Sequence, residues 1–235
     1  MAAFKAGPKP MHTRFYSCLF VLALALPPAA AAAPSLVTIG EANIKLPEPA
    51  GFVDPAPFSR EGADNLRAMI DNQKERFVAA FFEQTDIDAL KLGVMPDMAR
   101  VFSVRTLRAF EAKKFEPGEV KDVKETLKRK HNERLKSFET ANAGRKLTAD
   151  QIDLKIGEMV PLGVFNETDN SVSIAYLTRK ANAPGSGHEV LAQTFIFLKG
   201  KNILVHTISA FRSNDDIVWA RTAAIRWVTA ATRIN

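Results

Sequence analysis

Residues 188–212, HEVLAQTFIFLKGKNILVHTISAFR, hold the pattern that decides the fold. Two runs rich in β-branched and aromatic residues alternate with polar residues and are separated by a short segment that contains a glycine. This pattern is typical of two strands joined by a tight turn. We therefore predict a β-hairpin whose turn is formed by Gly200 and Lys201.

The alternation of apolar and polar residues, with a period of two, extends upstream of this hairpin. The segments EMVPLGVF (158–165) and SVSIAYLTR (171–179) flank NETDN (166–170), which consists of residues that favour turns. We expect the four strands of these two hairpins to be antiparallel neighbours. After them, Ser213 or Asn214 can cap a closing helix whose apolar residues lie on one side, so that it packs on the sheet. Those residues are Ile217, Ala220, Ala224, Trp227 or Val228, and Ala231.

The first half of the chain predicts further elements of both kinds. Strands are expected at 42–46, 75–86 and 97–110, and helices at 60–73, at 85–93 with Thr85 or Asp86 as its cap, at 116–139, and after Thr148. One continuous helix through Phe82 is the alternative for residues 60–82. The predicted fold class is α+β, an antiparallel β-sheet with flanking helices, in a single domain that follows a signal peptide.

The N-terminal segment predicts export. Lys5, Lys9 and Arg14 precede the apolar stretch CLFVLALALPPAAAAAPS (18–35), in which the apolar core is too short to span a bilayer and ends at two prolines. We predict a signal peptide over 1–33, cleaved near Ala32, a proline-rich extended lead-in over 34–58, and an α+β domain over 59–235. The protein is then periplasmic or secreted, and cleavage removes its single cysteine.

Charge gives little information about partners. The formal charge of +6 falls to +3 when the three cationic residues of the signal peptide are removed, so we expect no nucleic-acid partner. In the basic segment 113–146, positively and negatively charged side chains alternate, which is typical of a solvated helix. An anionic membrane surface, contacted through Lys128, Arg129 and Arg134, is a further hypothesis. No transmembrane segment is expected in the mature chain.

No catalytic, cofactor-binding or metal-binding residue is assigned from the sequence. The histidines of the mature chain, His131, His188 and His206, fall on different predicted elements without ligand spacing. Ser186 beside His188 is the nearest approach to a Ser and His arrangement. Several other polar or aromatic groups have a structural interpretation. We expect the oxygen-bearing residues of 166–170 to form a turn and not a calcium site, and Asp86 and Asp88 to be acids at the start of a helix. We expect Trp219 and Trp227 to be core residues and not part of a membrane-interfacial helix face.

The order of elements resembles that of PsbP-like α/β sandwiches. The resemblance rests on the entry IKLPEPAGF (44–52), the hairpin GKNILVHTISAF (200–211) and SAFRSNDDIVW (209–219), and it extends to uncharacterised exported proteins of Gram-negative bacteria. It implies an accessory or binding protein. We therefore predict an exported periplasmic protein without catalytic activity or cofactor, whose partner is an unknown protein or envelope component. The alternative is a periplasmic hydrolase whose site the sequence does not locate.

Overall fold

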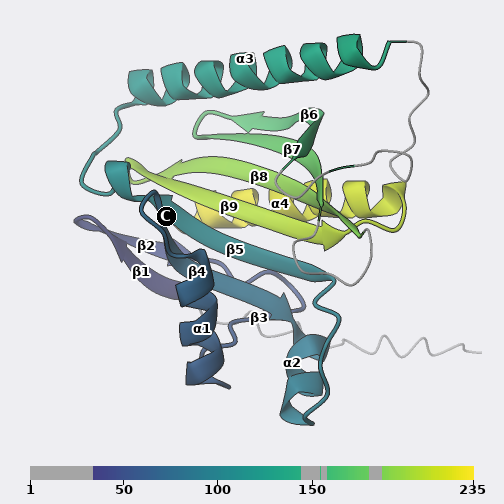
Figure 1. The fold of residues 1–235 in the computed structure, drawn as a ribbon. Helices are drawn as coiled ribbons and strands as arrows, with labels where there is room; N and C mark the ends of the chain where they lie inside the picture. The colour runs from purple at the N-terminus through teal and green to yellow at the C-terminus, as the bar shows by residue number, and fades with distance from the viewer. Residues whose placement is uncertain (1–33, 144–153, 155–157, 180–186) are drawn as a thin grey trace, which may run out of the picture. The chain divides into compact units, whose positions relative to one another are not determined.

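The computed structural model describes residues 34–143, 154, 158–179 and 187–235, which belong to one compact unit over residues 31–235. The predicted signal peptide and the predicted helix after Thr148 lie outside the described residues. Within them the fold is α+β, as predicted: a seven-stranded antiparallel sheet, a separate two-stranded hairpin and four α-helices (Figure 1).

The strands of the large sheet lie in the order β3-β4-β5-β9-β8-β7-β6. Their bounds are Phe52–Val53 (β3), Glu75–Glu83 (β4), Arg100–Leu107 (β5), Met159–Thr168 (β6), Ser171–Arg179 (β7), His188–Leu198 (β8) and Lys201–Ala210 (β9). The last four strands are antiparallel neighbours, which confirms the two predicted hairpins. The single helix proposed as the alternative for residues 60–82 is wrong, because α1 (Arg60–Ile70) ends before β4 begins.

The turn between β8 and β9 is formed by Lys199 and Gly200, so the predicted turn is wrong by one residue. Leu198 pairs with Lys201, and both turn residues have positive φ, 50° and 75°. A two-residue hairpin turn of this kind requires positive φ at both positions, and its backbone twist matches that of the strands. The glycine therefore occupies the second turn position, and Lys201 is free to begin β9.

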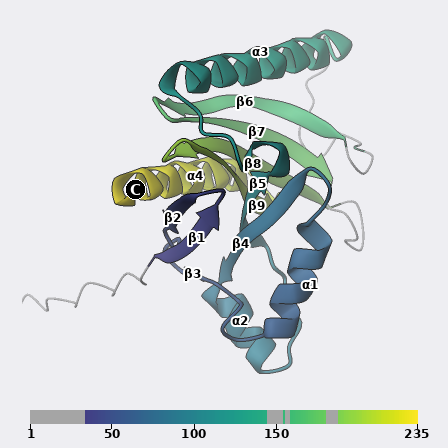
Figure 2. The same ribbon diagram turned by 90° about the vertical axis from the view of Figure 1, so that its left-hand side faces the viewer.

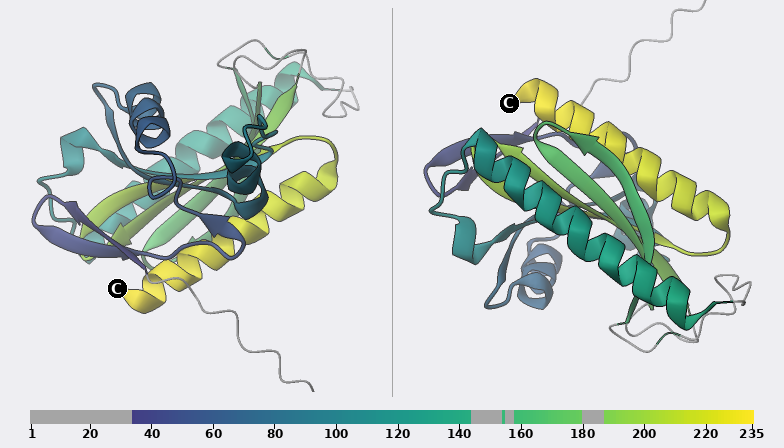
Figure 3. Two further views of the ribbon diagram at one scale, coloured as in Figure 1. Left: turned by 90° about the horizontal axis from the view of Figure 1, so that it is seen from below. Right: turned by 90° about the horizontal axis from the view of Figure 1, so that it is seen from above.

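Helices cover both faces of the sheet. The closing helix α4 (Asn214–Ile234) packs with Ile196 of β8, whereas α3 (Pro117–Ala141) packs with the adjacent Phe195. Successive side chains of a strand point to opposite faces, so the two long helices lie on opposite sides of the sheet (Figure 3). On the face of α3, helices α1 and α2 (Gln84–Lys91) cover the end formed by β3 and β4.

The proline-rich lead-in contributes a second small sheet. The strand predicted at Ala42–Leu46 is confirmed as β2, and it pairs with β1 (Ser35–Ile39), which we did not anticipate. Ile39, Ile44 and Leu46 are fully buried against the main sheet and α4. Figure 2 shows this hairpin beside the C-terminal end of α4. Thus residues 35–53 supply part of the core as well as the entry to the domain.

Candidate functional site: a cavity between α1 and α2

Helices α1 and α2 come before and after β4 in the sequence, and α2 follows β4 without an intervening residue. Ser59 caps α1 by accepting a hydrogen bond from the Gly62 N–H at 3.0 Å. Leu66 and Ile70 of α1 pack on Phe77 and Phe82 of β4, together with Ile87 of α2. Both helices therefore rest on the same strand, and the space between them is walled by apolar side chains.

This space is a cavity of about 510 Å³. A volume of this size falls within the range of small-molecule sites. Its lining is mostly apolar and comes from the turn before α1, from both helices, from β4 and from the loop that leads to β5. The lining residues are Pro55, Phe58, Ser59, Gly62, Asn65, Leu66, Phe82, Asp86, Ile87, Leu90, Lys91 and Met98.

Asp86 is the acidic group of this lining. Its residue is 9% exposed, and its Oδ2 is buried without a hydrogen-bond partner among the described residues. Burial raises the pKa of Asp86 above its usual value because it penalises the charged form, and the negative charge of Asp97 adds to this effect. A hydrogen bond from the backbone of Met98 acts in the opposite direction. The carboxyl group thus offers an unused acceptor inside an apolar cavity.

A second charged residue lies at the rim. The Lys91 ammonium sits 4.3 Å from the centroid of the Phe58 ring and 3.0 Å from Asp88 Oδ1. Asp88 also accepts a hydrogen bond from Gln84, and it points to solvent. The lysine charge is therefore already neutralised outside the cavity, whereas the Asp86 carboxyl group has no cation beside it in the described contacts.

The sequence interpretation of Asp86 was incomplete. Helix α2 begins at Gln84 with Glu83 at the cap position, two or three residues before the predicted caps Thr85 and Asp86, so neither of them is its cap. Asp86 still lies in the first turn, but its side chain faces inward beside Ile87. Its spacing of four residues from Leu90 was the signal available in the sequence, because residues at this spacing share a helical face.

The three histidines do not come together. His131 lies in α3, His188 at the start of β8 and His206 in β9, and no group of three metal-ligating side chains is found among the described residues. His131 is buried, and its Nε2 accepts the Gly163 N–H at 3.1 Å, while its Nδ1 has no hydrogen-bond partner in the described part of the chain. Burial, and then the charge of Arg134, lower the pKa of His131. His131 is accordingly placed as a packing residue of α3 and β6.

The segment 166–170 is a strand end and a turn. Asn166 and Glu167 belong to β6, and only Asp169 and Asn170 form the turn, so the turn interpretation holds for part of the segment. Glu167 pairs with Lys128 at 2.8 Å and with the buried Lys124 at 3.2 Å. Its carboxylate therefore binds α3 to the sheet.

The cations proposed to contact a membrane all have partners within the chain. Besides the pair formed by Lys128, Arg129 pairs with Glu133 at 3.0 Å, and Arg134 hydrogen-bonds Tyr176. Among the described residues, no helix is long and apolar enough to cross a bilayer. Ser186, the partner suggested for His188, lies outside the described residues.

The two tryptophans of α4 pack inward, as predicted. Trp227 is 3% exposed, and its Nε1–H donates to the Pro47 carbonyl oxygen at 3.1 Å. Trp219 packs against Phe52 and Phe102, and Arg100 lies 4.5 Å from its ring centroid. A smaller cavity of about 300 Å³ adjoins both tryptophans, and no buried unpartnered acceptor is recorded among its lining residues.

Comparisons with known proteins do not assign this chain to a family. No protein-family model matches the chain, and no curated protein sequence matches it. The structure is similar to the crystal structure of the Saccharomyces cerevisiae Ran-binding protein Mog1p, with 12% sequence identity over 85% of this chain and 93% of that chain. The TM-score of this match is 0.35, a level at which the likeness carries no argument about function.

Proposed function

We propose that this protein is a non-catalytic binding protein of the periplasm or the secreted space, and that its ligand occupies the cavity between α1 and α2. The observation that carries the proposal is the Asp86 carboxyl group, buried with one unpartnered oxygen in an apolar cavity of about 510 Å³. A buried polar group without a partner destabilises the folded state, and native structures retain few of them. A ligand that supplies the missing donor relieves this cost.

The ligand class follows from the lining. Apolar walls favour an alkyl or aryl body, and the carboxyl group favours a hydrogen-bond donor or a cation at one end of it. A primary amine on a short alkyl chain combines both features. Its ammonium group pairs with Asp86, and its chain replaces water beside Leu66, Phe82 and Ile87.

The cavity favours binding over hydrolysis. Its hydroxyl side chain is Ser59, whose Oγ is engaged as an acceptor in the α1 cap, and its lining includes no histidine. A hydroxyl nucleophile needs an adjacent general base, and the lining residues place no such base beside Ser59. Export remains part of the proposal on the strength of the N-terminal sequence pattern alone.

The test compares two ligands of equal length in two proteins. Calorimetric titration is expected to show octylamine binding to the wild type more tightly than octanol, because only the amine can pair with the carboxylate. In Asp86→Asn the amine is expected to lose about tenfold in affinity, the equivalent of about 1.4 kcal/mol, while octanol binding changes little. Asparagine preserves the shape of the side chain and can still accept the hydrogen bond from Met98.

Asp64→Asn is the matched control. This carboxylate lies on α1, is exposed and does not line the cavity, so its removal is expected to leave both affinities unchanged. Equal loss of amine binding in the two variants would show that the effect is general charge attraction. Binding of neither ligand to the wild type would refute the proposed class of ligand.

A further inference from the structure

The segment that follows α2 carries apolar side chains into solvent. Leu92 is 81% exposed, Val94 57% and Met95 85%, and Leu90 in the last turn of α2 is 43% exposed. We call Leu90–Met95 the apolar tip. Phe58 and Met98, which line the adjoining cavity, are also exposed, whereas Leu36 and Val218 lie on other elements of the described part of the chain. Single exposed apolar residues are ordinary, whereas a contiguous group indicates an interaction site.

The tip projects away from the sheet. Figures 1 and 2 both show α2 and the loop after it at the end of the molecule remote from α3. Leu92, Val94 and Met95 line neither of the two cavities described above, and their high exposure indicates that they project from the surface.

The backbone of the tip is fixed by hydrogen bonds. Gly93 has a φ of 73°, and the Val94 N–H donates to the Ala89 carbonyl oxygen at 2.9 Å. These are features of a Schellman motif at the end of a helix, which usually brings the residue after the glycine onto the helix in an apolar contact. Here Val94 stays more than half exposed. The tip is thus held in shape while its side chains remain free to contact another apolar medium.

The charges around the tip are paired within the chain. Lys91 pairs with Asp88 and lies over Phe58, and Arg212 pairs with Asp97. A partner would therefore meet an apolar end with balanced charges behind it. This arrangement lacks the charge pattern that would select an oppositely charged protein surface.

We propose that the apolar tip inserts into the interfacial region of a lipid bilayer with zwitterionic headgroups. A projecting apolar end without net charge can enter the boundary between headgroups and acyl chains, and Phe58 and Lys91 are then positioned at headgroup level, where aromatic and cationic side chains are favoured. This inference goes beyond the proposed ligand site and does not depend on it. The cavity then lies beside the lipid, because Leu90 belongs to both the cavity lining and the apolar tip.

The expected attachment is weak and reversible. A single myristoyl chain gives an association constant of about 10⁴ M⁻¹, and three or four side chains bury less apolar surface than such a chain. Half-binding is therefore expected only at lipid concentrations on the order of millimolar or above. Because the tip is neutral, raising the salt concentration should not release the protein.

The test places a fluorescent reporter at the tip. In Leu92→Trp, phosphatidylcholine vesicles are expected to shift the added tryptophan emission to shorter wavelength, and brominated lipid is expected to quench it. Val218→Trp is the matched control, because Val218 is 61% exposed on α4 and should show neither change. The parent protein, with Trp219 and Trp227, supplies the spectrum to subtract.

A second pair of variants tests the native side chains. The double variant Leu92→Asp and Met95→Asp is expected to lose flotation with neutral vesicles, while Leu36→Asp, on the β1–β2 hairpin, retains it. The inference is overturned if Leu92→Trp shows no shift with phosphatidylcholine, or if binding requires anionic lipid and disappears at high salt. It is equally overturned if the wild-type protein is a dimer, the double aspartate variant is a monomer, and the two bind vesicles equally.

Discussion

At the scale of single residues, His206 shows how a buried polar group sets the response to pH. It lies in β9 between Ser103 of β5 and Gln193 of β8, and its Nε2 is 3.0 Å from the Gln193 amide nitrogen. Burial, and then the charge of Arg105, lower the pKa of His206 from 6.5 to about 3. The imidazole is therefore neutral in the folded protein over most of the acidic range.

We predict that the protein loses stability as the pH falls below 6.5. The unfolded chain takes up a proton on this histidine near pH 6.5, whereas the folded chain does so only near pH 3. Between these values the free energy of unfolding should fall by about 1.4 kcal/mol per pH unit from this residue. Urea unfolding at a series of pH values measures the slope.

His206→Gln removes the titration but keeps a neutral polar side chain beside Gln193. Its unfolding free energy should therefore vary less with pH than that of the wild type. Ser209→Ala, which changes a buried residue of β9 that does not titrate, is the control and should leave the slope unchanged. An identical slope in the wild type and in His206→Gln would show that burial does not hold this imidazole neutral.

The residue scale is also where sequence reasoning reached least far. The alternation of β9 placed His206 in a strand but did not show which face is covered. The same holds for Lys124 and His131, which belong to the segment predicted to be a solvated helix and are both buried. Burial depends on which elements pack together, and a polar residue on an apolar stripe gives no local sign of its tertiary partner.

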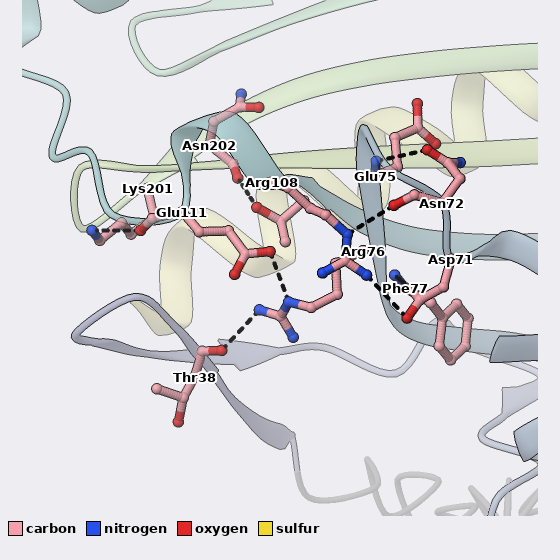
Figure 4. A network of polar contacts seen from close by, with 11 residues as sticks. Thr38, Asp71, Asn72, Glu75, Arg76, Phe77, Arg108, Glu111, Lys201 and Asn202 are labelled. Carbon is pink, nitrogen blue, oxygen red and sulfur yellow. Dashed lines mark hydrogen bonds and ion pairs between the residues drawn. The ribbon is translucent and has the colours of Figure 1, made fainter. Parts of the chain in front are cut away.

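At the scale of elements, the β1–β2 hairpin is fixed by polar contacts to backbone carbonyl groups. Figure 4 shows Lys201 and Arg76 in this network. The buried Lys201 ammonium donates to the carbonyl oxygens of Glu111, Ala112 and Lys113 at 2.9–3.3 Å. Arg76 pairs with Glu111 at 2.8 Å and donates to the Thr38 carbonyl oxygen of β1 at 3.2 Å. The segment after β5 is thereby connected to both sheets.

The hairpin turn fits closely against this network. Gly40 has a φ of 56°, and a Cβ atom at this position would lie 2.2 Å from the Glu111 carbonyl oxygen and 2.8 Å from Lys201 Nζ. Both the backbone conformation and the available space therefore require glycine. The docking of residues 35–46 depends on this contact as well as on the burial of Ile39 and Ile44.

We predict that Lys201→Met destabilises the protein by about 2 kcal/mol. Methionine can fill a similar volume, but it leaves the three carbonyl groups without their donor. Urea unfolding measures the change, and Lys45→Met, an exposed position on β2, serves as the control with an expected change near zero. Equal stability of Lys201→Met and Lys45→Met would mean that water satisfies these carbonyl groups and that the lysine contributes nothing to docking.

Sequence periodicity predicted most of the described elements and both C-terminal hairpins. The strand pattern of 97–110, the helix at 116–139 and the closing helix after Ser213 all have local signals. The structure confirms the three elements, although the strand is three residues shorter at each end, at Arg100–Leu107. The pairing of β5 with β9 has no local signal, because these strands are separated in the chain by α3 and by the three strands β6, β7 and β8. Likewise, the cavity forms where α1 and α2 meet β4, and the sequence of no single segment predicts that arrangement.

At the scale of the whole described unit, the two proposals concern the same end of the fold. The apolar cavity and the apolar tip share Leu90, and both lie on helices that cover the β3–β4 end of the sheet. The long helices α3 and α4 and the docked hairpin account for most of the remaining core. The small helices are thus positioned by a rigid sheet, a common arrangement for binding elements.

The most direct test of the proposed site is a crystal structure of the protein with 8-bromooctylamine, in which anomalous scattering locates the bromine. We predict a bromine peak in the cavity between α1 and α2, near Phe82 and Ile87, with the amine nitrogen within hydrogen-bond distance of Asp86 Oδ2. A peak in the smaller cavity beside Trp219 and Trp227, or no ordered peak at saturating ligand, would contradict the account.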